Sequence, residues 1–159
     1  MVDEAHSRGL KVASHAHGAE GIINALIAGA DTIEHASFID DEGIRLAIEN
    51  DAALSMDIYV TEYILGEGAS AGILEESLEK ERMTGVTKRS TFRKAVESGA
   101  TIVYGTDAGV YPHGQNAKQL SRMTRFGMTP LQAVQSATTV AAEVMGLGYE
   151  VGKIEAGYA

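Results

Sequence analysis

One sequence pattern recurs three times and constrains the fold more than any other feature: a glycine among small or apolar residues, a short β-forming run, and a polar side chain where the run ends. The three glycine and polar pairs are Gly9 with His15, Gly29 with His35, and Gly99 with Asp107, at spacings of six, six and eight residues. Segments rich in helix formers lie between the runs. Strands that alternate with helices predict βα units, and therefore a parallel sheet with right-handed crossovers.

The residue types also predict where these units begin and end. We expect strands at residues 11–14, 31–35, 53–59 and from 101 toward 107, and helices at residues 19–28, 40–50, 74–97, 117–127 and 129–145. The long helix at 74–97 has a weak point at Thr84–Gly85. Residues 60–72 contain several Gly and Ala, and we expect a loop there that covers or lines a site. Four βα units would make about half of an eight-stranded barrel.

Composition excludes several classes of function. The chain has 159 residues, a formal net charge of −9, thirteen scattered Lys and Arg, and no Cys. The charge argues against a nucleic-acid partner. The lack of Cys leaves only His and carboxylates as metal ligands. A basic leader is missing, and no apolar run approaches the roughly 18 residues that a membrane span needs, so we expect a soluble, cytoplasmic protein without a membrane partner.

The polar residues at the strand ends suit a metal site. The carboxyl ends of parallel strands meet at one edge of the sheet, so we expect His15, His35 and Asp107 to converge there. Imidazole and carboxylate suit zinc and neighbouring first-row metals, which lower the pKa of bound water. Asp107 could both bind the metal and take the proton. The alternative from the residues alone is that both histidines are hydrogen-bonded sheet-end residues and that Asp107 caps the following turn.

Three further residues are candidates for substrate binding: His17, Tyr59 and His113. His17 lies two residues after His15, so it is either a second metal ligand on the same strand face or, as we prefer, a loop residue that hydrogen-bonds substrate. Tyr59 would end the third strand and either reach a substrate carboxylate or carbonyl, or fill the barrel mouth. His113 follows Asp107 in a loop, where it either touches substrate or is merely exposed.

The motifs around these residues resemble the second half of the amidohydrolase superfamily. They read His-Ala-His-Gly-Ala-Glu from His15, Ala-Gly-Ala-Asp-Thr-Ile-Glu-His up to His35, and Tyr-Gly-Thr-Asp-Ala-Gly around Asp107. The resemblance is closest to the imidazolonepropionase-like and Xaa-Pro or Xaa-Arg dipeptidase (prolidase-like) branch. It implies an α/β fold that covers strands five to eight of a metal-dependent (β/α)8 TIM barrel. It also implies that His15 and His35 are the metal histidines of strands five and six, and that Asp107 is the strand-eight aspartate that binds metal and shuttles the proton.

Two parts of the family pattern have no counterpart in this sequence: the His-x-His of strand one and the carboxylated lysine of strand four. The chain also begins in what reads as the middle of a helix, and it closes on a Gly-Lys-Ile-Glu-Ala-Gly that resembles the family's turn into a small β-sandwich. We therefore expect residues 1–150 to form half of the barrel and residues 151–159 to begin a truncated β-sandwich segment. The sequence then represents a fragment of a longer protein.

These observations lead to one hypothesis with two alternatives. We expect a metal-dependent hydrolase of amide or peptide C–N bonds that uses metal-activated water, zinc or another divalent ion, and a small-molecule amide or dipeptide substrate. We also expect a homo-oligomer. One alternative is a non-catalytic fragment of such an enzyme, which self-associates through an exposed sheet edge. The other is an α/β module that binds a small ligand without metal.

Overall fold

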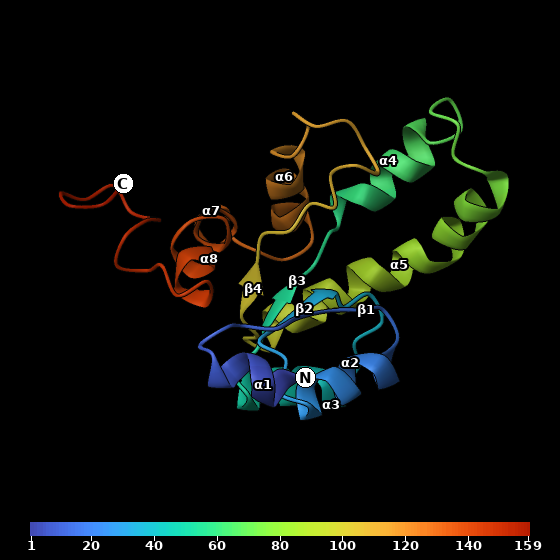
Figure 1. Cartoon of the computed structure of the whole chain (residues 1–159). Helices are drawn as coiled ribbons and strands as arrows, with labels where there is room; N and C mark the ends of the chain where they lie inside the picture. Colours follow the sequence, from blue (N-terminus) through green and yellow to red (C-terminus); the bar gives the residue numbers. More distant parts are fainter.

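The computed structural model describes residues 1–159 and shows an α/β fold built on one parallel sheet (Figure 1). The four strands lie side by side in chain order, and at least one helix separates each from the next. The strands are β1 (Ala13–Ala16), β2 (Thr32–His35), β3 (Ala53–Ser55) and β4 (Ile102–Val103). The prediction of βα units around a parallel sheet is therefore confirmed.

Eight helices accompany the sheet. They are α1 (Val2–Ser7), α2 (Ala19–Ile27), α3 (Asp41–Glu49), α4 (Tyr59–Glu67), α5 (Glu75–Glu97), α6 (Lys118–Arg125), α7 (Pro130–Ser136) and α8 (Thr139–Val144). Helix α2 packs against α3, α4 against α5, and α6 against α7. In Figure 1, α1 to α3 lie together below the sheet, whereas α4 and α5 extend to the upper right. The Asp40 side chain accepts a hydrogen bond from the Gly43 N–H and caps α3.

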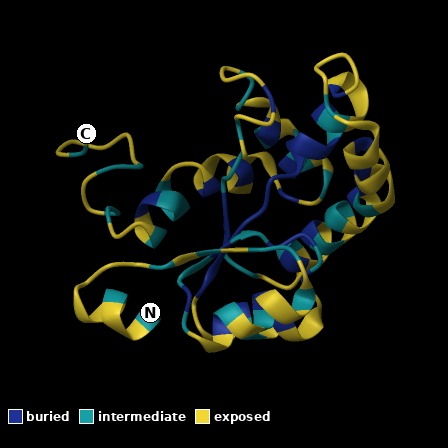
Figure 2. Cartoon of the chain, turned by 45° about the vertical axis from the view of Figure 1, so that its right-hand side comes forward, coloured by how far each residue is buried: buried dark blue, intermediate teal, exposed yellow.

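The two faces of the sheet differ in chemistry because alternate strand residues point in opposite directions. One register row joins Ser14, Ile33, Leu54 and Ile102. The three apolar members of this row pack in one core with Ile22 of α2, Phe92 of α5 and Met123 of α6. The next row joins His15, Glu34 and Ser55, which line a polar depression. The helices thus bury one face of the sheet, and the other face carries the polar depression. Figure 2 shows that α1 and the C-terminal segment are more exposed than the sheet.

A partly buried carboxylate, Asp31, lies just before β2 and links it to the preceding elements. The Asp31 Oδ2 atom accepts a 2.7 Å hydrogen bond from the Val12 N–H and lies 2.9 Å from the Nε2 atom of His6. Burial by itself would raise the pKa of Asp31, but the hydrogen bonds from His6 and Val12 outweigh it and hold the pKa below its usual value. This carboxylate therefore ties α1 and the start of β1 to β2 while it is ionised.

The third strand and the segment after it differ from the prediction. The strand ends at Ser55 instead of Tyr59, and Tyr59 begins α4, so most of the predicted loop at residues 60–72 is helical. The reason is tertiary packing, because Tyr59, Val60 and Tyr63 lie on one buried helix face against Tyr111. This packing outweighs the low helix propensity of Gly66 within the helix.

Two other helices also depart from the prediction. Helix α5 runs for 23 residues without the weak point expected at Thr84–Gly85. Gly85 is buried where α5 crosses α4, and a Cβ atom there would lie 2.7 Å from Thr61 Cγ2, so this glycine permits a close helix contact. The helix predicted at 129–145 is divided into α7 and α8, because Thr138 has the non-helical angles φ −130° and ψ −93°.

The C-terminal residues 151–159 form turns and bends without a strand. The domain boundary at residue 150 and the β-sandwich segment after it therefore stay predictions. None of the helices is both long and apolar enough to cross a membrane.

Candidate metal centre

The carboxyl ends of β1 and β2 bring three imidazoles together. The ring centres lie 4.4 Å apart for His15 and His35, 4.5 Å for His17 and His35, and 4.9 Å for His15 and His17. One ligand nitrogen from each ring lies within 4.8 Å of the others, which is the reach of a single bound ion. The convergence follows from the register, because Ala16 and His35 are direct neighbours across the two strands.

Backbone geometry turns His35 toward this group. His35 and the next residue, Ala36, have φ angles of 72° and 47°, in the left-handed region that side chains rarely adopt. Such conformations require support from the surrounding structure and are concentrated at functional sites. The support here includes the Ala36 N–H, which donates to the Ala16 carbonyl at 3.1 Å.

Asp57 holds the His35 ring in place. The His35 Nδ1 atom lies 2.8 Å from Asp57 Oδ1, and Asp57 is buried just after β3. Because a carboxylate accepts the bond, Nδ1 carries the proton and Nε2 is left with the free lone pair that a metal requires. The same hydrogen bond raises the pKa of His35 above its usual value, although burial acts in the opposite direction.

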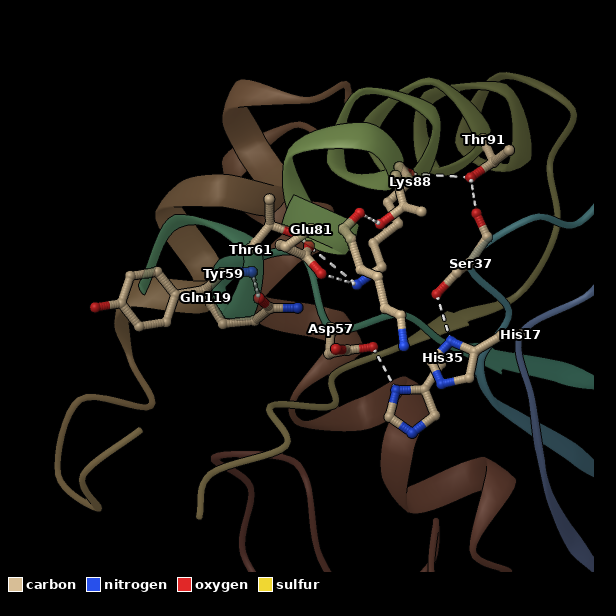
Figure 3. Close-up of polar contacts among 12 residues, drawn as sticks. His17, His35, Ser37, Asp57, Tyr59, Thr61, Glu81, Lys88, Thr91 and Gln119 are labelled. Atoms are coloured by element: carbon tan, nitrogen blue, oxygen red, sulfur yellow. Dashed lines mark hydrogen bonds and ion pairs between the residues drawn. The ribbon is translucent and has the colours of Figure 1, made fainter. Parts of the chain in front are cut away.

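Ser37 orients the ring of His17, which stacks on the ring of His35. The His17 Nδ1 atom lies 2.8 Å from Ser37 Oγ, and the Ser37 carbonyl accepts a 2.9 Å hydrogen bond from Thr91 Oγ1 of α5 (Figure 3). Burial lowers the pKa of His17, and the nearby His35, His15 and Lys88 lower it further. His17 is therefore held as a neutral imidazole, which can bind a metal or accept a hydrogen bond from a ligand.

Asp107 reaches the same place from the loop after β4, which ends at Val103. Its φ angle of 51° is also left-handed, and the loop around it is fixed because Asn116 Nδ2 donates to Thr106 Oγ1 at 3.1 Å. One carboxylate oxygen of Asp107 lies within 4.8 Å of ligand atoms from both His35 and Asp57. The chain therefore presents two candidate ligand groups that share His35.

The three predicted metal ligands line one depression of about 270 Å³. Its other lining residues are Glu34, Ser55, Asp57, Gly105 and Thr106, so it contains no hydrophobic residue. Imidazole nitrogens and carboxylate oxygens that converge on an open polar space fit zinc or a neighbouring first-row ion. His35 belongs to both ligand groups, so such an ion would be held by His35 with His15 and His17 on one side, or by His35 with Asp107 on the other.

None of the three predicted substrate residues lines this depression, although the His17 ring lies beside that of His35. Tyr59 and His113 are the other two. The Tyr59 hydroxyl donates to Gln115 Oε1 at 3.0 Å, and its ring packs edge-on against Tyr111 with ring centres 5.0 Å apart. His113 is exposed in the loop after Asp107. A substrate role for either residue stays a prediction, and the Tyr59 contacts agree with the alternative of an aromatic packing residue.

Sequence reasoning missed Asp57 as part of the centre. Its signal was present, because a carboxylate that interrupts an apolar run near a strand end is out of place in a packed strand. Glu34 was also missed. It lines the depression beside His35, and its carboxylate accepts a 2.7 Å hydrogen bond from Thr32 Oγ1. A strand residue that precedes a ligand histidine gives no separate signal in a single sequence.

Comparisons with known proteins give a consistent result. The model of the Amidohydrolase family matches residues 1–159. The ochratoxinase of Aspergillus niger is 33% identical over 139 residues, which make up 87% of this chain and 28% of that protein. Its crystal structure matches 99% of this chain, and 36% of its own, with a TM-score of 0.83.

Two dipeptidase structures are also similar. A Xaa-Pro dipeptidase with methionine bound in its active site is 39% identical, with a TM-score of 0.90 over 99% of this chain and 39% of that chain. A prolidase complexed with N-methylphosphonate-L-proline is 28% identical, with a TM-score of 0.86 over 99% of this chain and 38% of that chain. The chain thus spans between 28% and 39% of the length of these relatives.

Proposed function

Because this chain belongs to the amidohydrolase family, we propose that it supplies one part of an enzyme that hydrolyses an amide or peptide C–N bond in a small molecule. The observation that carries the proposal is the convergence of His15, His35 and Asp107 on one polar depression at the carboxyl ends of the strands. The similar proteins, a Xaa-Pro dipeptidase, a prolidase and an ochratoxinase, support a dipeptide or an N-acyl amino acid as substrate.

Each residue of the centre has a role in this proposal. A divalent ion, zinc or another first-row metal, would polarise the scissile carbonyl and make water more acidic. His15 and His35 would hold the ion, with His35 oriented by Asp57. The Asp107 carboxylate takes a proton from the attacking water and delivers it to the leaving nitrogen, so that a C–O bond forms as the C–N bond breaks. His17 hydrogen-bonds the substrate or shares the ion.

The proposal is tested by metal content and turnover in the full-length protein that contains this chain. We expect a near-stoichiometric divalent metal, loss of metal in His35→Ala, and unchanged metal in His113→Ala, because His113 lies outside the depression. Asp107→Asn should abolish the hydrolysis of Xaa-Pro dipeptides and N-acyl amino acids. Wild-type turnover in Asp107→Asn, or full metal content in His35→Ala, would refute the proposal.

A second candidate role is self-association. Strands β1 and β4 are the outer strands of an open sheet, and such edges have unpaired backbone groups that favour pairing with another chain. We propose a homo-oligomer on this basis. Light scattering of the 159-residue chain tests it, and a clean monomer would contradict it.

A further inference from the structure

The turn that carries Asp57 lies between β3 and α4, and the sequence of that turn cannot hold it alone. Tyr59 is the first residue of α4, so its N–H has no partner within the helix. The N-cap residue is Ile58, which has no polar side chain and makes no capping bond. The segment from Met56 to Tyr59 is fully within the buried part of the chain, where water cannot supply the missing bonds.

Gln119 of α6 supplies these bonds. Its Oε1 atom accepts a hydrogen bond from the Tyr59 N–H at 2.7 Å, and its Nε2 atom donates to the Met56 carbonyl at 2.7 Å. Gln119 is 0% exposed, and a buried amide is unfavourable unless both of its ends are bonded. The amide therefore fits one arrangement of the turn, with one bond on each side of Asp57. Figure 3 shows the bond between Gln119 and the Tyr59 N–H.

The contacts then continue to the centre. Asp57 accepts a hydrogen bond from His35 Nδ1 at 2.8 Å. A displacement of the turn would move the Asp57 carboxylate, and the His35 ring would lose the bond that fixes both its orientation and its tautomer. A route of direct contacts thus joins Gln119, the backbone beside Asp57, and His35.

We infer that Gln119 is a positioning residue that acts through Asp57 on His35. The link to metal binding rests on the proposed function, because there His35 is a metal ligand. The link to the His35 tautomer does not rest on it, because the hydrogen bond from His35 to Asp57 is present without a metal. The two links can therefore be measured separately.

The first measurement is the His35 tautomer in metal-free full-length protein. At about pH 9, where an ordinary histidine ring is neutral, nitrogen NMR shifts should show the proton on Nδ1 in the wild type. In Gln119→Met the proton should redistribute toward Nε2, as it should in Asp57→Leu, which removes the acceptor. Ser121→Ala is the control, because Ser121 lies on the same helix but is exposed, and its side chain bonds the Lys118 carbonyl and Arg122 within α6, so its His35 shifts should match the wild type.

The second measurement is zinc affinity by competition with a chromophoric chelator. Loss of a group that orients a metal-binding histidine lowers metal affinity by about 10-fold to 100-fold, and we expect this range for Gln119→Met and for Asp57→Leu. The double variant should bind zinc as tightly as the single variant with the lower zinc affinity, because both changes act on the same hydrogen bond. Gln119→Glu keeps the acceptor for the Tyr59 N–H, so its zinc affinity should lie between those of the wild type and Gln119→Met. It serves as the test if the methionine variant folds poorly.

Two results would overturn the inference. One is an unchanged His35 tautomer in folded Gln119 variants. The other is a double variant whose loss of zinc affinity is the product of the two single losses, because Gln119 would then act independently of Asp57. A wild-type protein that binds neither zinc nor another first-row divalent metal would refute the proposed function alone, and the tautomer measurement would still decide the role of Gln119.

Discussion

The buried ion pair of Lys88 and Glu81, both on α5, gives a prediction whose size can be worked out from the structure. Lys88 Nζ lies 3.1 Å from both carboxylate oxygens of Glu81, and the two side chains are 14% and 9% exposed. Thr61 Oγ1 also donates to the Glu81 carboxylate (Figure 3). The Lys88→Met variant keeps most of the side-chain volume but leaves the Glu81 charge buried with a single hydroxyl as its donor.

Removing one partner of a buried ion pair costs about 3–5 kcal/mol, because the remaining charge loses its compensation. Lys88 retains some exposure, so we take the lower end, about 3 kcal/mol. For a domain of this size each kcal/mol lowers Tm by about 2–4 °C, which gives a decrease of roughly 6–12 °C. Adding Glu81→Gln removes the buried charge and keeps an acceptor for Thr61, so the double variant should recover most of the loss.

Urea unfolding of the wild type, the single variant and the double variant measures these differences. The matched control is Lys80→Met on the same helix. Lys80 pairs with Glu76 at 3.1 Å, but these side chains are 73% and 77% exposed, and such pairs contribute no more than about 0.5 kcal/mol. If Lys88→Met lowers the free energy of unfolding no more than Lys80→Met does, the Lys88–Glu81 pair contributes no more than an exposed pair, and the prediction is wrong.

Three smaller changes test other parts of the structure. The lowered pKa of Asp31 means that its contribution to stability is present above the unfolded pKa of about 4 and is lost as the pH falls through the folded pKa. Asp31→Asn should therefore destabilise the chain in urea at pH 7 but not in strong acid, and an equal loss at both would contradict this. Thr129→Ala removes a capping box and should cost about 0.5–2 kcal/mol in thermal unfolding, more than Thr138→Ala, whose side chain makes no capping bond to α8. Gly105→Ala would place a Cβ atom 2.2 Å from Ser55 Oγ and should lower the free energy of unfolding by about 1–3 kcal/mol. Adding Ser55→Ala should restore stability, because the nearest remaining atom, the Cβ of residue 55, lies at 3.4 Å. A double variant as unstable as the single variant would refute this contact.

The positions of three strands could be predicted from the sequence because their signals are local. A glycine, a β-forming run and a polar residue after it located β1, β2 and β4 and brought His15, His35 and Asp107 to one depression, although β4 ends at Val103, four residues before Asp107. Parallel pairing then required no further information, since short strands separated by helices form parallel sheets. The left-handed backbone at His35 and Asp107 gave no local signal, because neither residue is glycine.

The features that could not be predicted depend on contacts between distant segments. Helix α4 forms because Tyr59 and Tyr63 meet Tyr111, about fifty residues later in the chain. Gly85 reads as a helix breaker until its contact with Thr61 is known. Asp57 and its support from Gln119 likewise join β3 to α6, and periodicity within a single segment carries no record of such a contact.

The position of His35 in both candidate ligand groups limits how this chain can hold metal. A neutral imidazole has one nitrogen with a free lone pair, and in His35 the other nitrogen is occupied by the hydrogen bond to Asp57. The group with His15 and His17 and the group with Asp107 therefore compete for the same nitrogen, and the chain cannot fill both groups with separate ions through His35. A single ion bound to Nε2 of His35 must then take its other protein ligands from the pair His15 and His17, from Asp107, or from both. Replacement of His35 should accordingly abolish metal binding by this chain, whereas replacement of His15 or of Asp107 leaves a second group in place and should only weaken it.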